Sequence, residues 1–139
     1  MSFFNDEQKI TKRFLDSWDA VSNPYKTIPV DCVSEKKDPV GGKLIRFRIK
    51  RAPSTSRGLG NLRRNFGSAM VQIVVPFGSG AGTITKIADV ISAMFKEVDG
   101  RPLRLGNIKF RTASANGPFE EESLVTMVVD VPFSSDYSD

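Results

Sequence analysis

The stretch that decides the fold is residues 68–98, SAMVQIVVPFGSGAGTITKIADVISAMFKEV. Its first nine residues, which end at Pro76, are mostly apolar and β-branched, a pattern that predicts a central strand. The glycine-rich FGSGAG at 77–82 predicts a tight connection, because glycines permit backbone conformations that other residues avoid. From Thr83 to Val98, apolar residues recur every three or four positions, which predicts an amphipathic helix. The segment therefore predicts a strand–turn–helix unit whose apolar faces need further elements to cover them.

Upstream of this unit, residues 5–20 predict a first helix. Ile10, Phe14 and Trp18 recur every four residues and form an apolar stripe. Asn5 is placed to cap the helix, with Gln8 three residues further on. The sequence therefore predicts a second amphipathic element that packs on the same sheet.

Two strands are expected between this helix and the central unit. Residues 27–33 are rich in β-branched side chains but contain Pro29, which predicts a short edge strand. Residues 43–50, KLIRFRIK, alternate apolar and basic side chains, so one face of that strand is expected in the core. Residues 51–65 are rich in Gly, Ser, Pro and Arg and predict a long basic loop, because connections of this length are uncommon between strands.

Downstream, residues 103–112 and 123–133 predict two more strands. The glutamates at 120–122 predict an exposed turn before the last strand, and residues 134–139 predict a frayed acidic tail. The whole chain, 1–139, is then one α+β domain in the order α-β-β-β-α-β-β. Two amphipathic helices are expected to flank a mixed or antiparallel sheet of four to five strands.

Composition argues against catalysis. The 139 residues contain no histidine and a single cysteine, Cys32. Histidine is the commonest general base near neutral pH and the commonest metal ligand, so the usual zinc sites and nucleophilic triads cannot be built. No intrachain disulfide is possible either, and no apolar run approaches the ~20 residues of a membrane span. We expect a non-enzymatic protein without cofactor or metal, made in a reducing cytoplasm.

Charge is distributed unevenly along the chain. Between Pro39 and Ala88 there is no acidic residue, whereas from Thr112 onward there is no basic one. Such polarity bears on partners rather than on the fold. Arginine suits interfaces because its planar group pairs bidentately with carboxylates. The sequence therefore predicts assembly-interface residues of both signs: Arg46, Arg48, Lys50, Arg51, Arg57, Arg63, Arg64, Glu120, Glu121 and Glu122.

The glycine-rich connection at 78–82 has a second interpretation, as a phosphate cradle at a helix N-terminus. A Walker loop would need Gly-Lys-Ser/Thr at the start of the helix, whereas this chain has Gly82-Thr83-Ile84. The dinucleotide pattern G-x-G-x-x-G is also missing. A simple turn between strand and helix is the better interpretation.

The order and spacing of several segments resemble the tail terminator, or tail completion, proteins of bacteriophages with long non-contractile tails. No single motif carries the resemblance, which covers roughly residues 8–110. The matching pieces are the Ile10, Phe14 and Trp18 stripe, Ile28-Pro29-Val30, Asp38-Pro39, Leu44-Ile45-Arg46-Phe47, Gly58-Leu59-Gly60, Phe66-Gly67, Val71-Gln72-Ile73-Val74-Val75-Pro76, and Ile87-Ala88-Asp89-Val90-Ile91 with Phe95.

The resemblance implies a virion protein at the head-proximal end of the tail. Its copies would form a homohexameric ring that caps the tail tube and then meets the head-side connector. Genomic DNA would pass through the ring, and we expect no tight binding, since each firm phosphate contact adds affinity and salt dependence. We further expect the basic 57–64 segment to meet acidic groups of a neighbouring copy or of the tube end. Alternatives are another neck or head–tail connector subunit, a basic nucleic-acid-binding accessory protein and, last, a small phosphate-ligand enzyme.

Overall fold

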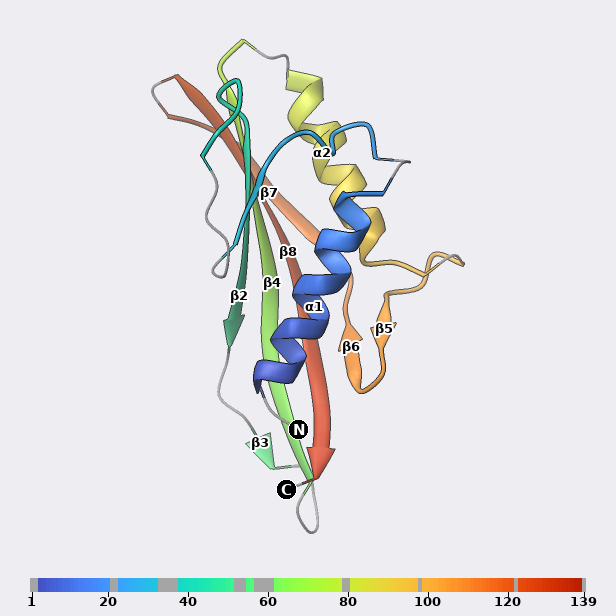
Figure 1. The fold of residues 1–139 in the computed structure, drawn as a ribbon. Coiled ribbons are helices and arrows are strands. Elements are labelled where there is room, and N and C mark those ends of the chain that lie inside the picture. Colours follow the sequence, from blue (N-terminus) through green and yellow to red (C-terminus); the bar gives the residue numbers. More distant parts are fainter. Residues whose placement is uncertain are drawn as a thin grey trace.

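The computed structural model describes residues 3–20, 23–32, 38–51, 55–56, 62–78, 81–97, 99–121 and 123–138. They form a mixed α+β fold in which helices α1 (Phe3–Trp18) and α2 (Ala81–Met94) pack on an eight-stranded, mostly antiparallel sheet (Figure 1). The strands are β1 (Val30–Asp31), β2 (Leu44–Arg51), β3 (Thr55–Ser56), β4 (Leu62–Pro76), β5 (Arg104–Leu105), β6 (Ile108–Phe110), β7 (Ser114–Glu121) and β8 (Leu124–Ser138).

The sheet is built around two long strands. Its order is β1-β2-β4-β8-β6-β5, with β3 beside β4 and β7 beside β8. Strands β4 and β8 pair over their full length, from Leu62 opposite Ser138 to Pro76 opposite Leu124. Among the described strand pairs, β1 and β2 alone run parallel. The predicted fold class and element order are confirmed, whereas the predicted count of four to five strands is too small.

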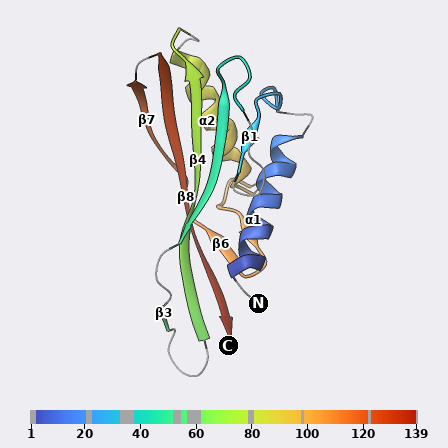
Figure 2. The same ribbon diagram turned by 60° about the vertical axis from the view of Figure 1, so that its left-hand side comes forward.

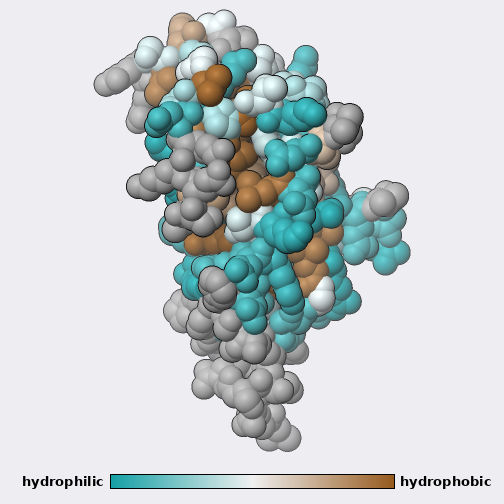
Figure 3. Space-filling view, viewed as in Figure 1, coloured by the Kyte–Doolittle hydropathy of each residue, from teal (hydrophilic) through white to brown (hydrophobic). Residues whose placement is uncertain are grey.

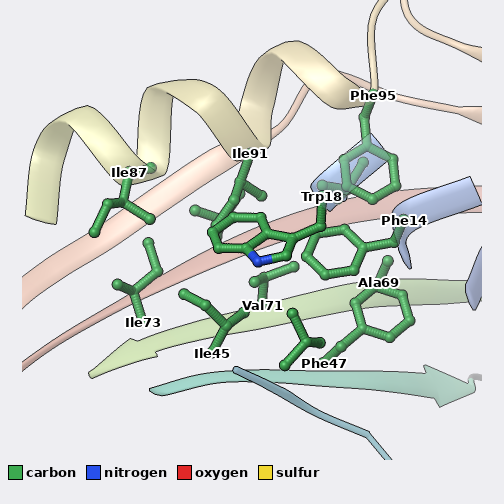
Figure 4. Packing of buried hydrophobic residues seen from close by; sticks show 14 of the residues in the cluster. Phe14, Trp18, Ile45, Phe47, Ala69, Val71, Ile73, Ile87, Ile91 and Phe95 are labelled. Atoms are coloured by element: carbon green, nitrogen blue, oxygen red, sulfur yellow. The ribbon is translucent and has the colours of Figure 1, made fainter. Parts of the chain in front are cut away.

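Both helices cover the same face of the sheet (Figures 1 and 2). Along β4, the alternate residues Ala69, Val71 and Ile73 are fully buried against this layer. Figure 4 shows Trp18 of α1 and Ile91 of α2 packed together above these strands. The core is therefore a single layer between the helices and one sheet face.

Aromatic rings join α1 to the sheet. The ring of Phe14 stacks on that of Phe47 in β2, with centroids 4.6 Å apart, and lies 6.0 Å from Trp18. Trp18 is buried, and its Nε1 donates a hydrogen bond to the carbonyl oxygen of Ile28 at 3.0 Å. These contacts explain why the four-residue stripe dominates the first helix, because each large ring buries much apolar area.

The helix boundaries differ from the sequence prediction by a few residues. Helix α1 begins at Phe3, so Asn5 lies in the first turn and does not cap it. Asn23 Nδ2 donates to the carbonyl oxygen of Trp18 at 2.8 Å, which stabilises the end of α1. Helix α2 ends at Met94 instead of Val98, because the chain turns there and Lys96 pairs with Pro102. The apolar period continued past the point where backbone pairing takes over.

The predicted long loop at 51–65 and the frayed tail at 134–139 are both wrong in extent. Arg51 belongs to β2, residues 55–56 form β3, and β4 begins at Leu62. Residues 134–138 continue β8 and pair with β4. We call residues 62–67, 134–138 and β3 the arm, which extends beyond the helices in Figure 1. The alternating apolar pattern stops there because the buried side chains of this part, Asn65, Ser134 and Ser135, are polar.

Strand β7 was not predicted, because its sequence SANGPFEE contains Asn-Gly-Pro, a typical turn signal. It lies at the edge of the sheet and shifts register between Asn116 and Phe119, where Pro118, which has no N–H group, fits an edge position. The predicted turn at 120–122 is shorter, since Glu120 and Glu121 belong to β7. The predicted strand at 103–112 is the hairpin β5–β6, which turns at Gly106 with a positive φ of 60°.

Candidate functional site: an open sheet face and two apolar surfaces

The sheet face opposite the helices, which we call the open face, carries three of the six predicted interface arginines, Arg46, Arg48 and Arg64. Between the buried residues of β4, Met70 and Gln72 point to this face and are half-buried. Arg48 lies opposite Met70, and Arg46 lies opposite Gln72. Across the sheet, Met70 also faces Asp130 of β8. The alternation predicted for residues 43–50 therefore places their basic side chains away from the core.

The carboxylate of Asp31 in β1 lies beside two arginines of β2, Arg46 and Arg48. Arg48 donates from Nη2 to Asp31 Oδ2 at 3.0 Å, and from Nη1 to the carbonyl oxygens of Asp31 and Phe47 at 2.9 and 2.8 Å. Arg46 Nε lies 3.9 Å from the same carboxylate. Asp31 is buried, so these contacts stabilise its charge and tie β1 to β2. The guanidinium of Arg48 is thus mainly committed within the subunit.

Arg64 of the arm pairs with Asp136 on the neighbouring strand. Its Nε and Nη2 donate to Asp136 Oδ1 and Oδ2 at 2.7 and 3.1 Å, a bidentate pair at directly opposed positions of β4 and β8. These hydrogen bonds raise the pKa of Arg64 above its ordinary value, against a smaller opposing effect of burial. Asn107 Nδ2 also donates to the carbonyl oxygen of Asp136 at 3.1 Å. The pair joins the two strands within one chain.

The other predicted interface residues lie in several places. Arg51 Nη2 contacts Glu7 Oε1 of α1 at 2.7 Å, so it points to the helix side. Lys50 is exposed on the open face, and Glu120 is exposed near the β7–β8 turn. Arg57 and Glu122 lie outside the described residues, and of Arg63 and Glu121 only the backbone, in β4 and β7, is described.

The basic and acidic regions that are separate in the sequence lie side by side in the structure. The basic middle of the chain forms β2 and β4, whereas the acidic C-terminal part forms β7 and β8. Strands β4 and β8 are direct neighbours, and Arg64 binds Asp136 across them. Charge that is separated along the sequence is therefore adjacent in space. The sequence argument for two separate docking patches of opposite charge does not carry over to the fold.

Three further cations belong to the open face and were missed in the sequence. Lys109 of β6 lies opposite Ser134 of β8 and opposite Arg104 of β5. Arg111 follows, and its backbone N–H donates to the carbonyl oxygen of Pro132 at 2.8 Å. Arg104, Lys109 and Arg111 are all exposed. Their strands are so short that alternation along the sequence gives no clear signal.

A groove of about 910 Å³ runs between α1 and the edge of β2. Apolar groups of Leu15, Cys32, Phe47 and Ile49 contribute to its lining. Glu7, Lys9, Lys12 and Asp16 of α1 supply charged groups around them. Figure 3 shows apolar surface exposed in patches between hydrophilic side chains on this side of the molecule. The groove was not predicted, because its walls come from segments far apart in the chain.

A second apolar surface lies at one end of the sheet, and we call it the distal end. It is defined by Val40, Phe77, Phe119 and Leu124, which are 64%, 62%, 55% and 40% exposed. Backbone contacts bring their segments together: the N–H of Phe77 donates to the carbonyl oxygen of Ser123 at 2.7 Å, and Leu124 pairs with Pro76. Large apolar side chains that gather on a surface often mark a contact with another protein.

Other possible sites receive little support. Of the glycine-rich connection, Gly78 and residues 81–82 are described, and α2 begins at Ala81. In the described ranges, no group of three or more cysteine or carboxylate side chains is arranged to hold a metal ion. Within the same ranges, no helix is long and apolar enough to cross a membrane.

A chain of known structure shares this fold, with a TM-score of 0.74 and 22% sequence identity over 100% of this chain and 99% of the other. At that identity the likeness shows the fold alone. No protein-family model matches the sequence, and no curated protein matches it.

Proposed function

We propose that this chain is a structural virion protein that caps a bacteriophage tail tube as a ring of identical copies. In this role it ends tube polymerisation and offers a surface for joining the head. The proposal rests on the resemblance of residues 8–110 to tail terminator proteins and assigns no reaction and no cofactor. Its partners are other copies of the chain, most simply six, the tail tube protein and the head-side connector.

The observation that carries the proposal is a pair of apolar surfaces on one small subunit, the floor of the groove and the exposed distal end. A closed ring uses heterologous contacts, in which two different patches of one subunit meet. The groove beside β2 is concave, whereas the distal end presents Phe77 and Phe119 outward. Apolar groups of this kind supply most of the binding energy in an interface. The two surfaces therefore give the subunit both halves of such a contact.

Charged side chains would then set orientation more than affinity. Exposed ion pairs contribute only about 0–1 kcal/mol each. Lys9 and Lys12 on the helix side of the groove and Glu120 near the distal end have opposite charges and are exposed. Such pairs favour one register between neighbours, because like charges placed together are repelled.

The first test is the mass of the assembly, measured by native mass spectrometry and by negative-stain microscopy of the purified full chain. We expect the wild type to form closed rings and Phe119→Asp to shift the protein toward monomer, since a carboxylate in an apolar contact is costly. Ala93→Asp places the same group on the exposed side of α2 and is the matched control. Rings that tolerate Phe119→Asp but not Ala93→Asp would contradict the assigned surface.

The second test separates a terminator from another neck protein. Tails assembled in infected cells without this protein should be overlong or lack heads, and electron microscopy of the particles measures both. Tails of normal length joined to heads would contradict the proposal. Normal tail length combined with failed joining would favour the alternative role in the neck.

A basic nucleic-acid-binding accessory protein is a second candidate function, favoured by the cations on the open face. It predicts a monomer that binds DNA firmly at physiological salt, whereas the ring proposal predicts assembly and only weak DNA binding. Gel-shift and sizing experiments on the same preparation distinguish the two.

A further inference from the structure

We propose that the open face of the sheet is the surface that meets double-stranded DNA, through phosphate contacts that do not read sequence. The inference rests on the proposed function for the nature of the polyanion, and it adds which side of the subunit faces it. The surface is defined by the side chains of β2, β4, β8 and β5–β6 that point away from the helices.

Cations lie on both flanks of this face. One flank is formed by β2, with Arg46, Arg48 and Lys50. The other flank is formed by the β5–β6 hairpin, with Arg104 and Lys109, and by Arg111, which directly follows β6. The two groups are far apart in sequence, but they lie on one face of the sheet because β4 and β8 join β2 to β6. The cations are spread over several strands, so this surface is better suited to bind an extended polyanion than to bind one acidic side chain.

The spacing of the flanks suits a nucleic-acid duplex. Lys50 lies opposite Ser68, which lies opposite Pro132, whose carbonyl oxygen accepts the N–H of Arg111. Lys50 and Arg111 are therefore in one row, three strand spacings apart, or about 14 Å at ~4.8 Å per spacing. The major groove of B-DNA is about 12 Å wide, so the two flanks can reach phosphates on either side of a groove.

The centre of the face favours weak binding. Asp130 lies there on β8, opposite Met70 and between the flanks. A carboxylate at this place repels phosphate, so contacts are confined to the flanks. Asp31 and Asp136 are held by Arg48 and Arg64, and the exposed Asp38 lies beside the β2 flank with Arg46 and Lys50. The remaining attraction is modest, which is what a passage for moving DNA requires.

The chemistry of the face points to phosphates and not to bases. Its central rows hold Met70, Gln72 and Val128, and the aromatic ring of Phe66 lies away from them, half-buried in the row of Ser134 and Lys109. When Lys and Arg side chains contact the phosphate backbone of DNA, the contact does not depend on the base sequence. Binding should therefore be equal for unrelated duplexes and fall steeply with salt.

The test is fluorescence anisotropy of a duplex of about 20 base pairs titrated with the full chain between about 50 and 200 mM salt. The variant K50E/K109E/R111E changes both flanks and spares Arg48 and Arg64. Each phosphate contact adds about 0.9 to the slope of log affinity against log salt, so we expect the slope to fall by about 2 to 3 and low-salt affinity by at least tenfold.

The matched control is R13E/K86E/K96E, which makes the same change in net charge on exposed positions of the helix side and outside the groove lining. We expect it to retain most of the affinity and the salt slope. Equal losses in both variants would show that only net charge matters and would overturn the assignment. Absence of low-salt binding by the wild type would overturn it too, including the case in which the face docks an acidic protein.

Ring assembly is measured on the same two variants, so the failure of this inference is distinguishable from failure of the proposed function. Intact rings without a loss of DNA affinity in K50E/K109E/R111E would remove the DNA-facing surface and leave the tail role standing. A wild type that forms no ring at any concentration would remove the tail role, whatever the anisotropy shows.

Discussion

The two faces of the sheet differ in almost every property, although they are built from the same strands. Along β4, Ala69, Val71 and Ile73 are fully buried under the helices, whereas Met70 and Gln72 between them are half-buried and face the open side. The covered face holds stacked aromatic rings, and the open face holds arginines, lysines and a few carboxylates. One face therefore holds the packing that stabilises the fold, and the other holds charged groups at the surface.

The largest effect should come from the covered face. Phe14 is fully buried and stacks on Phe47. Phe14→Ala should lower the free energy of unfolding by about 3–5 kcal/mol, because it removes buried area and leaves a cavity. Urea denaturation measures the change. Val74→Ala, on the half-buried open side, should cost less than about 1.5 kcal/mol. Equal costs at the two positions would break the distinction between the faces.

The next effect tests the close packing around Gly67 of β4. A Cβ at Gly67 would lie 2.6 Å from the carbonyl oxygen of Lys50 and 2.7 Å from Cζ of Phe133. Gly67→Ala should therefore destabilise the protein by about 1–3 kcal/mol, through overpacking at the root of the arm. Gly82→Ala is the control, because nothing lies within 4 Å and alanine favours a helix. A neutral Gly67→Ala in thermal unfolding would contradict the close contact.

A smaller effect concerns the charges of the arm. Asp136→Arg should lower the melting temperature, because two like charges then face each other, and adding Arg64→Asp should restore part of the loss. The raised pKa of Arg64 means that its contribution is present throughout the neutral range and is lost only as the pH rises far into the alkaline range. A double variant no more stable than the single one would show that the pair adds nothing.

The smallest effect is expected on the outer surface of α1. Lys12 Nζ lies 3.3 Å from Asp16 Oδ2, and both side chains are well exposed. Lys12→Ala should change the free energy of unfolding by no more than about 0.5 kcal/mol and should lose even that at high salt. A larger loss would show that Lys12 does more in the groove than form this ion pair.

The sequence predicted the covered face well, because burial leaves a period. The stripe of Ile10, Phe14 and Trp18 and the alternation in β2 gave both elements, their order and the fold class. It predicted the arm and β7 poorly. Residues 62–67 and 134–138 are strands through backbone pairing with each other, and their buried side chains Asn65, Ser134 and Ser135 are polar, so they leave no apolar period.

The candidate site was predicted only in part. The arginines of β2 are on a surface as expected, but the partners of Arg48 and Arg64 lie within the chain, at Asp31 and Asp136. The pairing of β4 with β8 brings Arg64 next to Asp136, and no local sequence pattern predicts that pairing. The groove and the distal end were missed for the same reason, since each is assembled from separate segments.

We propose that copies of this chain assemble through the groove beside β2 and the distal end. Native mass spectrometry of the purified full-length protein over a range of concentrations tests it most directly. We predict a closed ring of one stoichiometry that Phe119→Asp disrupts while the subunit stays folded. A protein that remains a folded monomer at every concentration would contradict it.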